Sequence, residues 1–203
     1  IAGLYIFDRK LRLLTLDAIE RIEVSIRAAI THDIAISLGP FGHTQREHFA
    51  PWFDHQRFMI ELQQEEQRAK ETFADHFRRK YTAETHLPVW MATELLTFGS
   101  LYKAMQPTAR QRIAAAYAVD AQFLVSWLHA LTYLRNVCAH HKRLWNRELA
   151  IKPRIPTRKP LMGPIPDNSW IYCMLVIIQH MLTVVAPRCH WRDRLFKLFE
   201  QHP

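Results

Sequence analysis

Residues 121–149 read AQFLVSWLHALTYLRNVCAHHKRLWNREL. Apolar side chains recur in the first part of this stretch at alternating steps of three and four, which predicts an amphipathic helix with one face toward a core. These positions are Leu124, Trp127 or Leu128, Leu131, Leu134 and Cys138. Residues 135–147, thirteen positions that overlap the end of this pattern, contain Arg135, His140, His141, Lys142, Arg143 and Arg147, together with Asn136 and Asn146. We therefore expect a core helix that runs straight into a basic surface.

The flanking sequence also has the periodicity of helices. Residues 3–38 carry an apolar stripe that predicts one long helix, or two in series, ended by Gly39 and Pro40. We expect most of the charges between the apolar positions, a set that includes Asp8 and Arg12, to be solvated. We expect a loop at 41–50 that exposes His43 and His48. Residues 52–81 predict a second long helix whose thin apolar stripe suits either a protruding helix or packing on a partner.

Five prolines make residues 152–166 a proline-rich loop, and helices are expected at 170–185 and 191–201. No strand pattern or internal repeat is present. Residues 1–203 are thus predicted to form a single all-α domain. Because Ile1 already stands inside a helical pattern, we also expect an N-terminal segment to precede it.

The positive charge is concentrated in the last third of the chain. Residues 1–134 contain 15 Lys and Arg against 15 Asp and Glu, whereas residues 135–203 contain 12 against 4, which accounts for the net charge of +8. A neutral scaffold followed by a basic third indicates a polyanion as partner, with nucleic acid the leading candidate. A basic tail that only improves solubility is the alternative, and the clustering of imidazoles with the cations favours the first interpretation.

Other classes of protein find little support in the sequence. Three cysteines without a close pair indicate a reducing cytoplasm rather than a disulfide framework. The most apolar run, residues 171–185, is too short to span a bilayer. His180, Cys189 and His190 are too scattered to predict a metal site, and no nucleotide-binding or cofactor motif is present.

The basic stretch has the groups needed for RNA cleavage without a metal. On a helix Asn136, His140, Arg143 and Arg147 step by four, three and four, so we expect them to line one stripe, with Arg135 about 140° from His140. An imidazole such as that of His140 transfers protons near neutral pH, and a guanidinium such as that of Arg135 binds phosphate through two N–H groups. The 2′-OH of RNA could then attack its own phosphate, a reaction that DNA cannot undergo.

The wider string resembles a known family. Leu134-Arg135-Asn136-Val137-Cys138-Ala139-His140-His141, with Arg143-Leu144-Trp145-Asn146-Arg147 after it, resembles the signature of the bacterial Abi (abortive infection) family related to AbiD and AbiF. Residues 5–23 look like the first conspicuous helix of that family, and residues 88–101 look like its middle segment. The resemblance covers about Tyr5 to Leu149.

The resemblance implies a HEPN-type helical bundle and a metal-independent endoribonuclease of phage defence with an R-N-x-x-x-H motif. Arg135 and His140 match the catalytic pair, and two copies in a homodimer would share one RNA-cleaving cleft. Asn136, His141, Lys142, Arg143, Asn146 and Arg147 are then the expected RNA or phosphate contacts. A neutralising antitoxin, RNA or protein, is an expected partner. The alternatives are a HEPN module that binds RNA or protein without cleavage, and a purely structural helical domain, against which the local charge argues.

Overall fold

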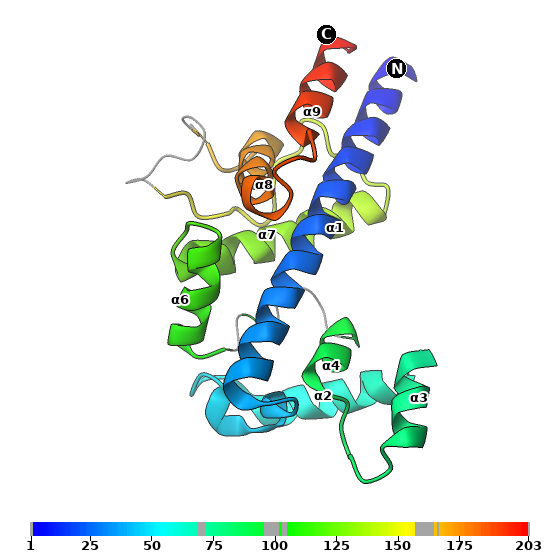
Figure 1. Cartoon of the computed structure of the whole chain (residues 1–203). Coiled ribbons are helices and arrows are strands. Elements are labelled where there is room, and N and C mark those ends of the chain that lie inside the picture. Colours follow the sequence, from blue (N-terminus) through cyan, green and yellow to red (C-terminus); the bar gives the residue numbers. More distant parts are fainter. Residues whose placement is uncertain are drawn as a thin grey trace. The chain divides into compact units, whose positions relative to one another are not determined.

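The computed structural model describes residues 2–68, 72–95, 102, 105–156, 165 and 167–202. Within these residues every regular element is a helix, and the only β-type pairs are two isolated bridges. The predicted all-α fold is confirmed. The α-helices are α1 (Ala2–Leu38), α2 (His55–Arg68), α3 (Thr72–Lys80), α4 (Val89–Leu95), α6 (Pro107–Ala116), α7 (Ala121–Ala139), α8 (Ile171–Val185) and α9 (Trp191–Glu200), with 3-10 turns η1 (Gly42–Thr44) and η2 (Arg46–His48) (Figure 1).

The N-terminal pattern forms one continuous helix, α1, rather than two in series. Its apolar stripe is buried at Leu11, Ile22 and Ile30, among others. The helix ends at Gly39, whose φ of 80° lies in the left-handed region that glycine adopts without a Cβ clash. None of the helices in the described ranges combines the length and the apolar character that crossing a membrane requires.

The chain groups into two compact units, residues 1–25 with 115–203 and residues 26–114, which we call the first and second units. The core of the first unit is built on α7 and α8, where Trp127, Leu131 and Ile178 are fully buried. Two buried indoles also donate hydrogen bonds, from Trp127 Nε1 to the Arg154 carbonyl and from Trp191 Nε1 to the Leu14 carbonyl, both at 2.8 Å. These bonds join α7 to the start of the proline-rich loop and α9 to α1.

The C-terminal elements follow the sequence pattern closely. Residues 152–156 form no regular structure, as predicted for the proline-rich loop, and most of 157–166 lies outside the described residues. Helices α8 and α9 begin and end within one residue of their predicted bounds. The prediction of a single domain over residues 1–203 stays a prediction.

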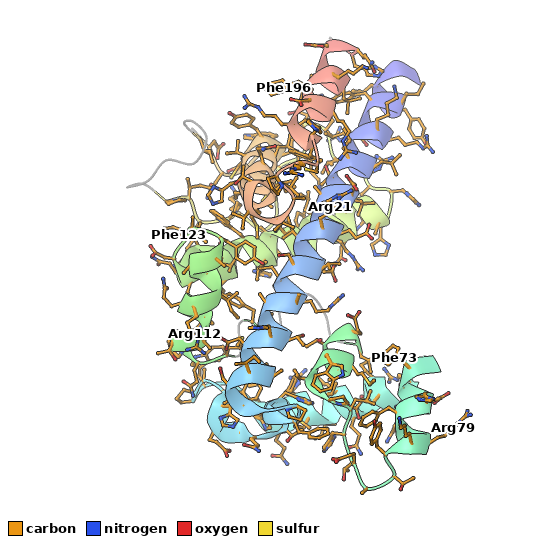
Figure 2. All side chains as sticks on the ribbon, in the orientation of Figure 1. Arg21, Phe73, Arg79, Arg112, Phe123 and Phe196 are labelled. Carbon is orange, nitrogen blue, oxygen red and sulfur yellow. The ribbon has the colours of Figure 1, made fainter. Side chains whose placement is uncertain are left out.

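The second unit packs the C-terminal part of α1 with α2, α3, α4 and α6. Ala74, Phe77 and Leu87 form one of its buried apolar clusters. Arg112 of α6, labelled in Figure 2, forms an ion pair with Asp33 of α1 in which Nε lies 2.9 Å from Oδ1. This ion pair joins α6 to α1 within the second unit.

The single helix predicted over residues 52–81 is wrong. Two helices, α2 and α3, stand on either side of residues 69–71, which lie outside the described residues, and they point in clearly different directions in Figure 1. The guanidinium of Arg78 also donates a hydrogen bond to the Glu66 carbonyl. A straight helix would separate residues twelve apart by about 18 Å, so the chain must turn between them. Each of the two helices buries apolar residues at helical spacing, so in the sequence the two patterns read as one continuous stripe.

The predicted exposure of His43 is also wrong, since only 1% of the residue is accessible. Its carbonyl accepts a hydrogen bond from Nε2 of His55 at 3.0 Å. Burial, reinforced by the nearby charges of His86 and His55, lowers the pKa of His43 from 6.5 to about 4. At neutral pH this imidazole is therefore an uncharged part of the second unit's interior.

Candidate functional site

Helix α7 places the predicted catalytic pair at its C-terminal end. Leu131, Leu134 and Cys138 are buried, as predicted, at 1% accessibility or less. Arg135 and Asn136 lie exposed in the last turns of the helix, where Arg135 Nη1 lies 3.4 Å from Asn136 Oδ1. His140, the residue that caps the helix C-terminus, is exposed as well. Both side chains are therefore open to a large polyanionic ligand.

The helix does not continue through the basic stretch, so the predicted single stripe of Asn136, His140, Arg143 and Arg147 is wrong. The His141 N–H bonds the Cys138 carbonyl at 3.1 Å, and the Lys142 N–H bonds the Val137 carbonyl at 3.0 Å. These two bonds form a Schellman motif, which ends a helix with a left-handed residue. His141 occupies that position with a φ of 55°, where glycine is the usual residue.

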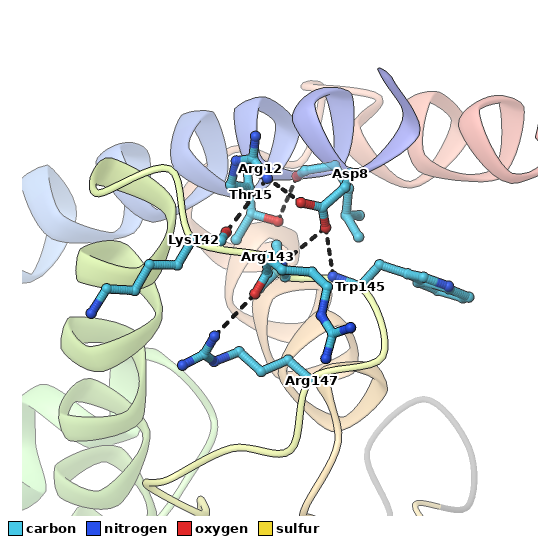
Figure 3. A network of polar contacts seen from close by, with 9 residues as sticks. Asp8, Arg12, Thr15, Lys142, Arg143, Trp145 and Arg147 are labelled. Atoms are coloured by element: carbon cyan, nitrogen blue, oxygen red, sulfur yellow. Dashed lines mark hydrogen bonds and ion pairs between the residues drawn. The ribbon is translucent and has the colours of Figure 1, made fainter. Parts of the chain in front are cut away.

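Residues 142–147, which follow His141, form a turn whose backbone N–H groups bind the side chain of Asp8 in α1 (Figure 3). One carboxylate oxygen, Oδ1, accepts hydrogen bonds from the N–H of Leu144 at 2.9 Å and from the N–H of Trp145 at 2.6 Å. We call residues 142–147 the basic turn. Consecutive backbone N–H groups of this kind form a site for an anion, and here the anion is the protein's own carboxylate.

Arg12, one helical turn after Asp8, completes this contact. Its guanidinium forms an ion pair and hydrogen bond with Asp8 Oδ2 and lies 3.4 Å from the Lys142 carbonyl. Asp8 and Arg12 are 6% and 5% accessible, so both are exceptions to the solvated face expected for most charges of α1. A buried charge needs a partner, and each of these two residues is the partner of the other.

Apolar contacts anchor the same turn. Leu144 is fully buried. The ring of Trp145 meets that of Phe7 edge to face, with centroids 5.1 Å apart, although 37% of Trp145 remains accessible. Side chains and backbone therefore both fix residues 144 and 145 against α1.

The cationic side chains of the basic turn extend away from α1 in Figure 3. Lys142 and Arg143 are exposed. Arg147 is half-buried, and its Nε donates to the Tyr133 hydroxyl at 3.1 Å while Nη1 donates to the Arg143 carbonyl at 3.2 Å. Asn146 has a φ of 49°, a left-handed conformation that asparagine tolerates better than most residues. The backbone of the turn is therefore a sufficient reason for an asparagine at this position.

The basic residues and histidines at this end of α7 have no acidic partners in the described part of the chain. No carboxylate there forms an ion pair with Arg135, His140, His141, Lys142, Arg143 or Arg147. Elsewhere arginines commonly pair with carboxylates, as in Arg21 with Asp17 and Arg57 with Glu61. Unpaired cations gathered on a fixed turn produce a local positive potential that attracts polyanions.

Other reactive groups of the first unit are less suited to chemistry. Burial raises the pKa of the Cys138 thiol to about 12, so it remains protonated at neutral pH and is a poor nucleophile. His180 Nε2 lies 2.9 Å from the Tyr117 carbonyl in the first unit. Among the residues that the structure describes, no three His, Cys, Asp or Glu side chains are arranged to hold a metal ion.

A family model described as Abi-like protein matches residues 1–146. The chain belongs to the Abi-like protein family. The match runs from the start of α1 through α7 and most of the basic turn, and so includes Asp8, Arg135 and His140. No curated protein matches the chain, and no solved structure matches it.

Sequence reasoning missed the contribution of α1 to the candidate site. A signal was nevertheless present, since Asp8, Arg12 and Thr15 follow one another at steps of four and three. Each follows directly after an apolar position of the α1 stripe, at Phe7, Leu11 and Leu14, so they border the buried face. Thr15 is fully buried too, and its hydroxyl donates to the Leu11 carbonyl at 2.8 Å.

Proposed function

We propose that this Abi-like protein is a metal-independent endoribonuclease of phage defence, of the abortive-infection kind, with Arg135 and His140 as its catalytic residues. The observation that carries the proposal is the exposed arginine and histidine at one end of α7, next to a fixed turn of cations without acidic partners. Family membership supports the biological context. A HEPN-type domain is part of the proposal and rests on the R-N-x-x-x-H motif.

In the proposed reaction His140 takes the proton of a ribose 2′-OH. The 2′ oxygen attacks the neighbouring phosphorus, and the bond to the 5′ oxygen of the next nucleotide breaks. That oxygen takes up a proton from water, which leaves a 2′,3′-cyclic phosphate and a free 5′-OH. The Arg135 guanidinium stabilises the additional negative charge on the phosphorus centre, while Asn136, His141, Lys142, Arg143, Asn146 and Arg147 bind neighbouring phosphates or bases.

The proposed setting is a cytoplasmic homodimer in which two copies of the motif face one RNA, with an antitoxin as a further partner. An exposed apolar segment at the start of α1 gives a reason to expect a protein partner. Leu4, Tyr5 and Ile6 are 56%, 66% and 47% accessible. Analytical ultracentrifugation of the wild type and of a Tyr5→Glu variant tests whether this segment forms the proposed dimer interface, because a charge placed there would then shift the protein to monomer.

The cleavage test uses labelled single-stranded RNA in EDTA, with the wild type, Arg135→Ala and His140→Ala. His129→Ala is a matched control, because His129 is an exposed histidine of the same helix. We expect wild type and control to produce 2′,3′-cyclic ends and both other variants to lose cleavage. Cleavage by His140→Ala at the wild-type rate would contradict the proposal.

A second candidate is an Abi-like module that binds RNA or protein without cleaving it. It is favoured by the exposure of the cations, because binding a polyanion needs only charge and an open surface. Salt-sensitive RNA binding by a dimeric wild type that leaves the RNA intact would support this candidate over the first.

A further inference from the structure

We propose that Asp8 and Arg12 are positioning residues that set the places of the cations of the basic turn, and thereby the affinity of the protein for RNA. This inference rests on the proposed function, since it concerns the same RNA-binding surface. It adds two buried residues of α1 that lie more than 120 positions before the turn.

The first step is the number of bonds that one side chain supplies. Asp8 Oδ1 accepts two consecutive backbone N–H groups, of Leu144 and Trp145, and Asp8 Oδ2 pairs with Arg12. The Arg12 guanidinium in turn lies within reach of the Lys142 carbonyl. Backbone groups of three of the six residues in the basic turn therefore meet this one buried pair.

The second step is the direction in which the turn presents its side chains. Because Asp8 fills the site formed by the two N–H groups, that site is closed to a phosphate from outside. A phosphate must then meet the outward side chains, chiefly those of Lys142 and Arg143, which are exposed and lack acidic partners in the described residues. The Asp8–Arg12 pair contacts the backbone of Lys142 and of Leu144, and Arg143 lies between these two residues. The pair therefore fixes the backbone from which both cationic side chains extend.

The third step is the connection to the catalytic residues. The Lys142 N–H closes the Schellman motif on Val137, so the backbone that Arg12 contacts at residue 142 is also part of the end of α7. At the other end of the turn, Arg147 returns to Tyr133, two residues before Arg135. Loss of the buried pair should therefore loosen the cations first and the surroundings of His140 second.

The test compares the wild type with Asp8→Ala and, as a milder variant that keeps an oxygen acceptor, Asp8→Asn. Asp17→Asn is the matched control, because Asp17 also pairs with an arginine four residues later on α1 in the first unit, but it contacts α9 instead of the basic turn. Hydrogen exchange measures protection of the Leu144 and Trp145 amides. Fluorescence anisotropy with a labelled single-stranded RNA measures Kd and its dependence on salt, on samples shown to be folded by circular dichroism.

We expect Asp8→Ala to lose protection at both amides, to bind RNA at least fivefold more weakly and to show a shallower salt dependence, with Asp8→Asn between it and the wild type. A fall in the folded fraction alone would raise the apparent Kd by the inverse of that fraction and leave the salt dependence unaltered. Asp17→Asn should match the wild type in every measurement. Loss of amide protection with wild-type Kd and salt dependence would overturn the inference while the proposed function stands, whereas a wild type that neither binds nor cleaves RNA would overturn the proposed function and the inference with it.

Discussion

Asp8 and Leu144 are 136 positions apart in the chain, and the carboxylate oxygen of one lies 2.9 Å from the amide nitrogen of the other. This hydrogen bond joins the first turns of α1 to the segment that follows α7. It shows that the helix at the start of the chain is part of the candidate site and not only its scaffold.

The buried pair should show strong coupling in a double-mutant cycle. Asp8→Ala leaves a buried guanidinium and two N–H groups without their partner, for which we expect a loss of about 3–5 kcal/mol in the free energy of unfolding. Arg12→Met should cost a similar amount. The double variant should lose much less than the sum of the two, because neither charge is then left alone. Urea unfolding of the four proteins measures this, and additive losses would contradict the pairing.

His141 predicts a variant that gains stability and loses function. Its left-handed backbone conformation costs a non-glycine residue about 1 kcal/mol or more, so His141→Gly should raise the free energy of unfolding by roughly that amount. The same change removes an imidazole from the proposed RNA surface and should weaken RNA binding. Thermal unfolding and anisotropy test the two effects separately. A less stable glycine variant would show that the His141 side chain itself holds the turn.

The helical pattern made most of the fold predictable, whereas the basic turn was not. Residues such as Leu131 and Leu134 alternate at helical steps, and they are buried as predicted. Nothing in the sequence after Cys138 indicates where the helix ends, because the position that normally carries glycine is occupied by His141. The helical stripe drawn through Arg143 and Arg147 failed for that reason.

Asp8 and Arg12 could not be distinguished from the solvated charges of α1 by periodicity alone. Both lie at the border of the apolar stripe, and a residue at that border is buried only when another segment covers it. The covering segment is the basic turn, which is distant in sequence. The place of Arg135 away from the buried face of α7 followed from the helical spacing, whereas the end of the helix at His140 did not.

His43 gives the stability of the protein a specific pH dependence. Its pKa is lowered to about 4 in the folded chain and is near 6.5 when unfolded, so the unfolded chain binds the extra proton between these values. The free energy of unfolding should therefore fall as the pH drops from about 6.5 toward 4, by up to about 3 kcal/mol from this residue. Unfolding in urea at pH 7, 6 and 5 measures the slope.

His43→Leu should flatten that slope. Neither ring nitrogen of His43 has a hydrogen-bond partner in the described residues, so an apolar side chain of similar volume should be tolerated at pH 7. An unchanged slope in this variant would assign the acid sensitivity to other groups.

The three cysteines should differ sharply in reactivity. Burial raises the pKa of Cys138 and of Cys173 to about 12, so both thiols stay protonated and covered at pH 8. Cys189 is only half-buried. A thiol reagent should thus modify one cysteine rapidly in the native protein and all three in denaturant, and peptide mapping should identify Cys189 as the first. Rapid native modification of Cys138 would mean that the end of α7 opens.

The exposed cations of the basic turn should account for part of the salt dependence of RNA binding. Each phosphate contact with single-stranded nucleic acid contributes about 0.7 to the slope of log Kd against log salt. Lys142→Gln and Arg143→Gln should each lower that slope by about this amount and weaken binding at low salt. Arg57→Gln removes the same charge from the second unit, at an exposed side chain already paired with Glu61, and should leave the slope unchanged. If RNA contacts the basic turn itself, the effect of a lost charge on the slope must depend on where that charge was. Equal changes in slope in all three variants would therefore show that RNA binding depends on the net charge of the protein and not on the basic turn.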